Sequence, residues 1–169
     1  MSDEYHQLGE TVSLDKLSYK LAIAFIKAVK KHRFARFRRA FKENESEGVE
    51  FECKPETVQF PVEDIQKSER LCAIFGQSDF VVPKVLALRK NFPRNLLHVN
   101  LTEDNVPISL CLFENYEEDR LILTPERLVQ KIFEWLRRAA LGELHLQDQP
   151  LEPFLLNPLV VIVGNEVVV

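Results

Sequence analysis

The chain has 169 residues, 46% of them hydrophobic, which is enough for one globular domain with a sizeable core but argues against two. Its net charge is only −4, so the overall composition does not favour nucleic acid or an anionic membrane as a partner. The N-terminus lacks a secretory signal, and the apolar stretch at 154–169 is too short and too interrupted to span a membrane. These features predict a soluble, cytoplasmic protein.

The cysteines and histidines do not form the patterns of a metal site. Cys53, Cys72 and Cys111 lie far apart with no CxxC pair, which argues against both a zinc site and a disulfide framework. The four histidines also lack metal-ligand spacing. We therefore predict no bound metal and a reducing environment.

An amphipathic helix is predicted from Ser13 to about Phe41. Apolar residues recur there at three- and four-residue spacing, which is the period of one helical face. Ser13 is a suitable N-cap for this helix. The period is lost in the following segment, where Gly48, Pro55 and Pro61 interrupt it.

Four extended segments follow, each rich in β-branched, aromatic or aliphatic residues and bounded by turn formers. They are Val49–Cys53, Thr57–Phe60, Arg70–Phe75 and Val81–Leu88. Their spacing predicts an antiparallel four-stranded meander. From Asn91 to Arg120 no period holds, so a long ordered loop is predicted, and loops of that length in compact domains are usually functional.

The last predicted helix begins after Thr124, which is placed as an N-cap with Pro125 at the first helical position. Gly142 is placed to end it. The order of elements predicts an α+β fold: an N-terminal helix, a meander, a long loop that contains Cys111 and a C-terminal helix. This domain is expected to cover residues 1–156, with 157–169 as a terminal strand or as the start of a linker to a following domain.

Four motifs in this order resemble the ubiquitin-conjugating (E2-like) enzymes. They are Val82-Pro83-Lys84-Val85, His98-Val99-Asn100, Leu110-Cys111-Leu112 and the helix after Thr124. The resemblance covers most of the chain. It implies the ubiquitin-conjugating-enzyme-like fold and a thioester on Cys111, which is received from an activating enzyme and passed to an amine.

Two departures from the common eukaryotic pattern resemble the bacterial branch of that family. Val99 replaces a proline, and the insert between Asn100 and Cys111 is longer by a few residues. The run at 135–156 is also similar to conjugating domains of antiphage (CBASS-type) operons, in which a conjugating–activating fusion modifies a cGAS-like nucleotidyltransferase. The partners implied are an adenylating (E1-like) activating enzyme or domain, a carried ubiquitin-like protein or cGAS-like nucleotidyltransferase, and a target lysine.

The resemblance gives roles to three residues of the active-site loop. Cys111 is the predicted nucleophile, although a cysteine between leucines is by default a small buried hydrophobic residue. Asn100 is the predicted donor to the oxyanion that forms during transfer, and a turn-stabilising role fits it equally well. His98 is predicted to organise the loop rather than to act as a base.

Two charged segments have weaker interpretations. Lys27, Lys30 and Lys31, with nearby arginines, are predicted to bind the activating enzyme, because the first helix of the family resembles its docking surface; a solvated helix face is the alternative. A nucleic-acid module is disfavoured by the overall acidity. The acidic run at 114–119 fits a solvated loop better than a site that orients a lysine, so it is left outside the catalytic set.

No Gly-rich phosphate loop is present, so no cofactor is predicted and activation with ATP must occur in a partner. The main alternative to an enzyme is a catalytically silent scaffold of the same fold, because a fold alone does not fix an activity. The local context of Cys111 favours the enzyme.

Overall fold

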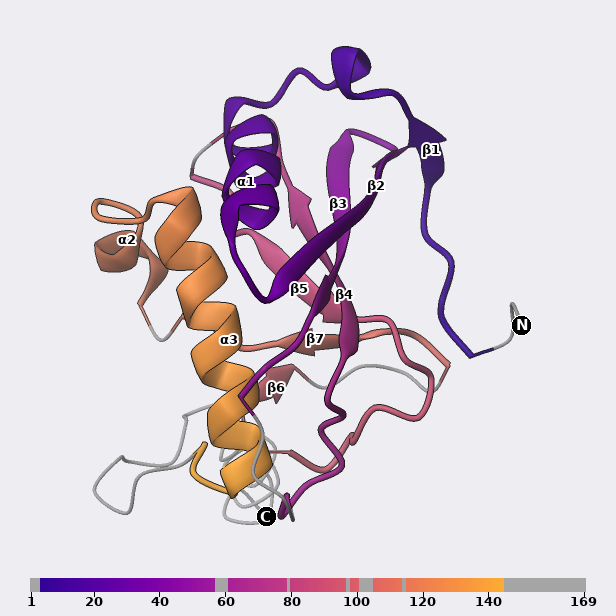
Figure 1. The fold of residues 1–169 in the computed structure, drawn as a ribbon. Helices are drawn as coiled ribbons and strands as arrows, with labels where there is room; N and C mark the ends of the chain where they lie inside the picture. Colours follow the sequence, from indigo (N-terminus) through magenta and orange to yellow (C-terminus); the bar gives the residue numbers. More distant parts are fainter. Residues whose placement is uncertain are drawn as a thin grey trace, which may run out of the picture.

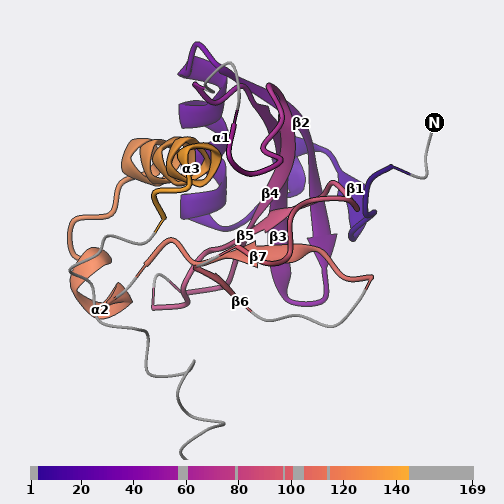
Figure 2. The same ribbon diagram turned by 90° about the horizontal axis from the view of Figure 1, so that it is seen from below.

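The computed structural model describes residues 4–56, 61–78, 80–96, 98–100, 105–113 and 115–144. Two longer helices lie side by side on one face of an antiparallel sheet, as Figures 1 and 2 show. The predicted α+β fold, with an N-terminal helix, an antiparallel sheet and a C-terminal helix, is therefore confirmed. The elements in chain order are β1 (Glu10–Val12), the 3-10 turn η1 (Leu14–Lys16), α1 (Lys20–Lys31), β2 (Ala35–Glu43), β3 (Ser46–Cys53), β4 (Glu69–Phe75), β5 (Lys84–Ala87), β6 (Val99–Asn100), β7 (Ile108–Leu110), α2 (Tyr116–Asp119) and α3 (Pro125–Leu141).

In the described part of the chain the sheet has seven strands in the order β1-β2-β3-β4-β5-β7-β6. The first five form a meander, in which each strand pairs with the next. β7 then pairs with β5, and β6 covers its other side. Of the predicted strands, those at 49–53 and 70–75 correspond to β3 and β4, and that at 81–88 is shorter, as β5. The strand predicted at Thr57–Phe60 lies outside the described residues.

The prediction of one helix from Ser13 to Phe41 is wrong at both ends. Ser13 precedes only a single 3-10 turn, and α1 starts at Lys20. The helix ends at Lys31, and residues 35–43 form β2. Side chains at the start of β2 alternate between half-buried and exposed, which is the period of a strand rather than of a helix. The long loop predicted from Asn91 to Arg120 contains more regular secondary structure than expected, since β6, β7 and α2 lie within it.

The start of α1 is held by a buried carboxylate instead of by an N-cap side chain. Glu47 on β3 accepts hydrogen bonds from the backbone N–H groups of Ser18 and Tyr19, at 2.7 and 2.9 Å. These amides precede the first helical turn, where negative charge is favourable. The sheet therefore fixes where the helix begins.

The main core lies between the two helices and the sheet. Phe25 of α1 contacts Phe51 of β3 and Phe75 of β4, each at 5.4 Å between ring centroids. From α3, Ile132 and Leu136 are fully buried in the same core. A smaller apolar cluster lies on the opposite face of the sheet, where the N-terminal segment contributes side chains.

Both ends of α3 agree with the sequence-based prediction. The Thr124 side chain accepts a hydrogen bond from the Arg127 N–H, and Pro125 occupies the first turn. Gly142 adopts the left-handed conformation, with φ of 71°, and ends the helix. None of the helices in the described ranges is long and apolar enough to cross a membrane.

A buried charge network joins β4, β5 and the segment before β4. Arg89 is 3% exposed, and its guanidinium donates two hydrogen bonds to Glu69, at 2.9 and 3.1 Å. It also bonds Asp64 at 2.8 Å and the carbonyl oxygen of Asn91 at 2.9 Å. Glu69 is itself buried, so its charge depends on Arg89 for compensation.

We expect Arg89→Met to lower the free energy of unfolding by about 3–5 kcal/mol, because it leaves the Glu69 carboxylate buried without its cation. Urea denaturation followed by circular dichroism measures this loss. The matched control is Arg38→Met, which removes a surface pairing with Glu52 and should cost about 1 kcal/mol or less. Equal losses in the two variants would contradict a special role for the buried network.

Candidate functional site

Burial separates the three cysteines into two classes. Cys53 on β3 and Cys72 on β4 are buried, whereas Cys111 is half-buried directly after β7. Burial, and to a lesser extent the nearby carboxylates of Glu69 and Glu50 respectively, raise the pKa of the Cys53 and Cys72 thiols far above the ordinary value. Those two groups stay protonated and shielded from solvent. Of the three thiols, that of Cys111 is the least buried.

The position of Cys111 is fixed by the pairing of β6 with β7. The Cys111 N–H donates to the carbonyl oxygen of His98 at 2.9 Å, one step beyond the last pair of the ladder, Val99 with Leu110. The Cys111 thiol lies 3.7 Å from the carbonyl oxygen of Phe113, to which it donates. The cysteine therefore follows the sheet directly, where the backbone leaves the ladder.

His98 turns the chain into β6. Its backbone lies in the left-handed region, with φ of 57°, which is uncommon for a residue with a side chain. The half-buried imidazole lines the same pocket as Cys111. His98, whose carbonyl oxygen accepts the hydrogen bond from the Cys111 N–H, thus also makes the turn.

Asn100 lies on β6, opposite Ser109 of β7, and is exposed. Its side-chain amide nitrogen donates to the Ser109 hydroxyl at 3.1 Å. This hydrogen bond links the two strands two residues before Cys111. Because an amide NH₂ has two hydrogens, the bond to Ser109 leaves one donor for a second acceptor.

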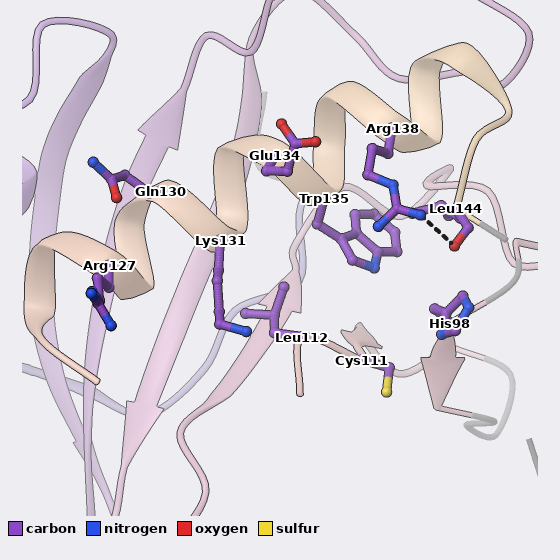
Figure 3. A pocket seen from close by; sticks show the side chains of 10 residues that line it. All are labelled: His98, Cys111, Leu112, Arg127, Gln130, Lys131, Glu134, Trp135, Arg138 and Leu144. Atoms are coloured by element: carbon purple, nitrogen blue, oxygen red, sulfur yellow. Dashed lines mark hydrogen bonds between the residues drawn. The ribbon is translucent and has the colours of Figure 1, made fainter. Parts of the chain in front are cut away.

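A pocket of about 440 Å³ opens between the cysteine loop, which here means His98 and the segment 111–113, and the side of α3 (Figure 3). His98, Cys111 and Leu112 line it on one side. The helix and the residue that follows its end contribute the remainder: Arg127, Gln130, Lys131, Glu134, Trp135, Arg138 and Leu144. His98 and Cys111 were predicted from the sequence, but the α3 residues of the pocket were not, although Arg127, Lys131 and Arg138 recur at the spacing of one helical stripe.

The basic residues predicted to lie on one long first helix are shared in the structure between α1 and β2. Lys27, Lys30 and Lys31 are exposed on α1, and Lys30 lies 5.0 Å from the ring centroid of Phe37. None of the three lysines lines the pocket that contains Cys111. Arg38 and Arg39 lie instead on β2, where they pair with Glu52 and Glu50. An exposed positive patch on α1 is thus limited to the lysines.

The acidic run after the cysteine includes the short helix α2. Glu117 pairs with Arg120 at 2.8 Å, and Asp119 pairs with Lys131 of α3 at 3.2 Å. Glu114 and His145 lie outside the described residues. Across the described ranges, no three His, Cys, Asp or Glu side chains converge as metal ligands would.

Comparison with known proteins gives one family. The family model described as Prokaryotic E2 family A matches residues 43–164, a range that contains most of the sheet, the cysteine loop and α3. No curated protein and no solved structure matches the chain.

Proposed function

Because the chain belongs to prokaryotic E2 family A, a bacterial branch of the ubiquitin-conjugating enzymes, we propose that it carries an acyl group as a thioester on Cys111. The observation that supports this most directly is the placement of Cys111. It is the half-buried member of three cysteines, it follows the β6–β7 ladder, and it lines a pocket.

The proposed reaction has two steps. In the first, the Cys111 sulfur attacks the carbonyl carbon of an acyl group that an activating enzyme presents as a thioester, and the thiol of that enzyme leaves with the proton. In the second, an unprotonated amine of a target lysine attacks the new thioester, and the Cys111 thiol is released. Each attack forms a negatively charged oxygen that a nearby N–H donor stabilises.

Asn100 is our candidate for that donor in the second step. Its amide lies on the strand next to β7 and has one hydrogen that does not bond to Ser109. His98 is proposed to organise the loop in two ways. Its left-handed backbone turns the chain, and its carbonyl oxygen accepts a hydrogen bond from the Cys111 N–H. Neither residue needs to change its protonation state in this scheme.

The partners follow from the same chemistry. Activation of a carboxylate requires an adenylating (E1-like) enzyme or domain, for which the exposed Lys27, Lys30 and Lys31 on α1 are the proposed docking surface. The carried group is a ubiquitin-like protein or a cGAS-like nucleotidyltransferase, and the setting is bacterial antiphage defence of the CBASS type. This finer proposal rests on the resemblance at 135–156, of which 145–156 lie outside the described residues. The strand or linker predicted at 157–169 also lies outside them.

Cys111→Ala should abolish formation of a reductant-sensitive adduct, because the acceptor sulfur is removed. Cys111→Ser should instead retain the acyl group as an ester that resists reductant. The measurement is mass spectrometry after incubation with activating enzymes encoded beside the gene, ATP and candidate modifiers. Cys53→Ala and Cys72→Ala are the matched controls and should still charge. Full charging of Cys111→Ala would refute the proposal. If the wild-type protein forms no adduct under any of these conditions, the domain is a catalytically silent scaffold.

Asn100→Ala should leave charging intact and slow discharge to lysine by about a hundredfold, if its amide donates to the oxyanion. Single-turnover charging, single-turnover discharge and melting temperature are measured on the same variant. The matched control is Ser109→Ala, which breaks the Asn100–Ser109 hydrogen bond but keeps the amide. Equal impairment of both steps and of stability in both variants would assign Asn100 a structural role only.

Reversing charge at Lys27, Lys30 and Lys31 together should slow charging by the activating enzyme, with the largest effect at low salt, since exposed charges mainly steer association. The rate of adduct formation is measured as a function of ionic strength. Charge reversal at Lys54, Lys67 and Lys90, which are also exposed but lie outside α1, is the control. Equal rates for the two triple variants would remove α1 from the partner interface.

A further inference from the structure

The wall of the Cys111 pocket contains a hydrogen-bond donor for which the described residues supply no acceptor. Trp135 is 6% exposed, and no acceptor among the described residues lies within hydrogen-bonding distance of its indole Nε1–H. Figure 3 shows the indole extending from α3 toward the side of the pocket where Cys111 and His98 lie. A buried N–H without an acceptor is unfavourable, and a ligand that supplies a carbonyl or carboxylate oxygen would satisfy it.

Two arginines of the same wall have no carboxylate partner among the described residues. Arg127 donates to the carbonyl oxygen of Ile122, and Arg138 donates to those of Glu143 and Leu144, so neither has a carboxylate partner within the described ranges. Lys131 pairs with Asp119.

The acidic residue of the wall offsets these charges only in part. Glu134 forms two hydrogen bonds with Arg137, which does not line the pocket, at 2.9 and 3.0 Å. That pairing, and to a lesser extent the charge of Arg138, lowers the pKa of Glu134. The pocket therefore presents an excess of cations and N–H donors.

The positive residues follow the length of α3 beside the cysteine. Arg127 and Arg138 are eleven positions apart, which corresponds to about 16 Å of helix. An extended peptide covers that distance with about five residues. In Figure 3 Cys111 lies toward the Trp135 and Arg138 end of the pocket, and Arg127 lies at the opposite end. A peptide whose last carbonyl is bonded to Cys111 could thus run along the helix toward Arg127.

We propose that this pocket receives the C-terminal tail of the carried protein and selects tails with an acidic side chain, an inference that rests on the thioester role of Cys111. The tail carboxylate pairs with Arg127, and Lys131, which also pairs with Asp119, adds positive charge one turn further along the helix. The Trp135 Nε1–H donates to an oxygen of the tail close to the thioester. Arg138 adds positive charge next to the reacting carbonyl. A tail with basic residues is disfavoured by the same charges.

Trp135 is the single tryptophan of the chain, so its fluorescence reports on the pocket directly. Cys111→Ala protein is titrated with three peptides of about five residues that end in the same glycine and differ by one glutamate, glutamine or lysine. We expect a saturable change in emission and an affinity about tenfold higher for the glutamate peptide than for the lysine peptide at low salt. Equal affinities for the three peptides would overturn the proposal.

Charge reversal in the pocket provides the second comparison. Arg127→Glu combined with Lys131→Glu should reverse the order of the three peptides. The matched control, Lys67→Glu combined with Lys90→Glu, makes the same change in net charge at exposed positions outside the pocket and should preserve the order. A reversal in the control as well would show a general charge effect and overturn the assignment to this pocket.

A third measurement separates this inference from the proposed function. Wild-type protein is incubated with the same peptides as thioesters of a small thiol; the Cys111 sulfur forms the new bond to the carbonyl carbon, and the small thiol leaves with the proton. Charging at equal rates, with equal binding, would retain the thioester role and overturn tail selection. Ranked binding to Cys111→Ala without any adduct on the wild type would retain the acidic-tail pocket and remove the thioester role.

Discussion

The buried guanidinium of Arg89 is the constraint on which much of this structure depends. A buried charge needs several partners, and Arg89, which is 3% exposed, obtains them from Glu69 on β4, from Asp64 just before β4 and from Asn91, two residues further along its own segment. It also lies 5.5 Å from the ring centroid of Phe92, and that ring stacks on Trp135 of α3 at 6.4 Å. The network that joins β4 to β5 therefore supports, through one aromatic contact, the helix residue that forms the wall opposite Cys111. Stability of the sheet and the shape of the pocket are linked by these side chains.

The second constraint is the register of β7. All three residues of this strand are buried, and its pairing with β5 on one side and β6 on the other fixes which side chains face the helices. A slip by one residue would exchange the two faces of the strand. Leu110 would then leave the core, and the Cys111 amide would lose the carbonyl of His98. Because Cys111 directly follows this strand, the core that holds β7 also holds the cysteine in place.

The sequence was sufficient to predict the fold class, the strands β3 and β4, and both ends of α3, because each has a local signal. The end of α1 was misplaced because β2 contains a register shift between Phe37 and Arg39, after which the consecutive residues Ala40 and Phe41 are both buried. This irregularity hides the strand period and leaves a spacing that also fits a helix. The strands β6 and β7 have two and three residues and exist only through distant pairing, so no local pattern could reveal them.

The candidate site shows the same division between local and tertiary information. Cys111, His98 and Asn100 were identified from a motif within one loop. Trp135 and the arginines line the pocket only because α3 packs beside that loop. The sequence therefore predicted an apolar helix face but not the role of the residues at the edge of that face. Yet the packing of the apolar face and the position of the basic edge depend on each other. The apolar face of α3 packs against the sheet and thereby holds its basic edge at Cys111, so core packing of this helix also determines which charges surround the thiol.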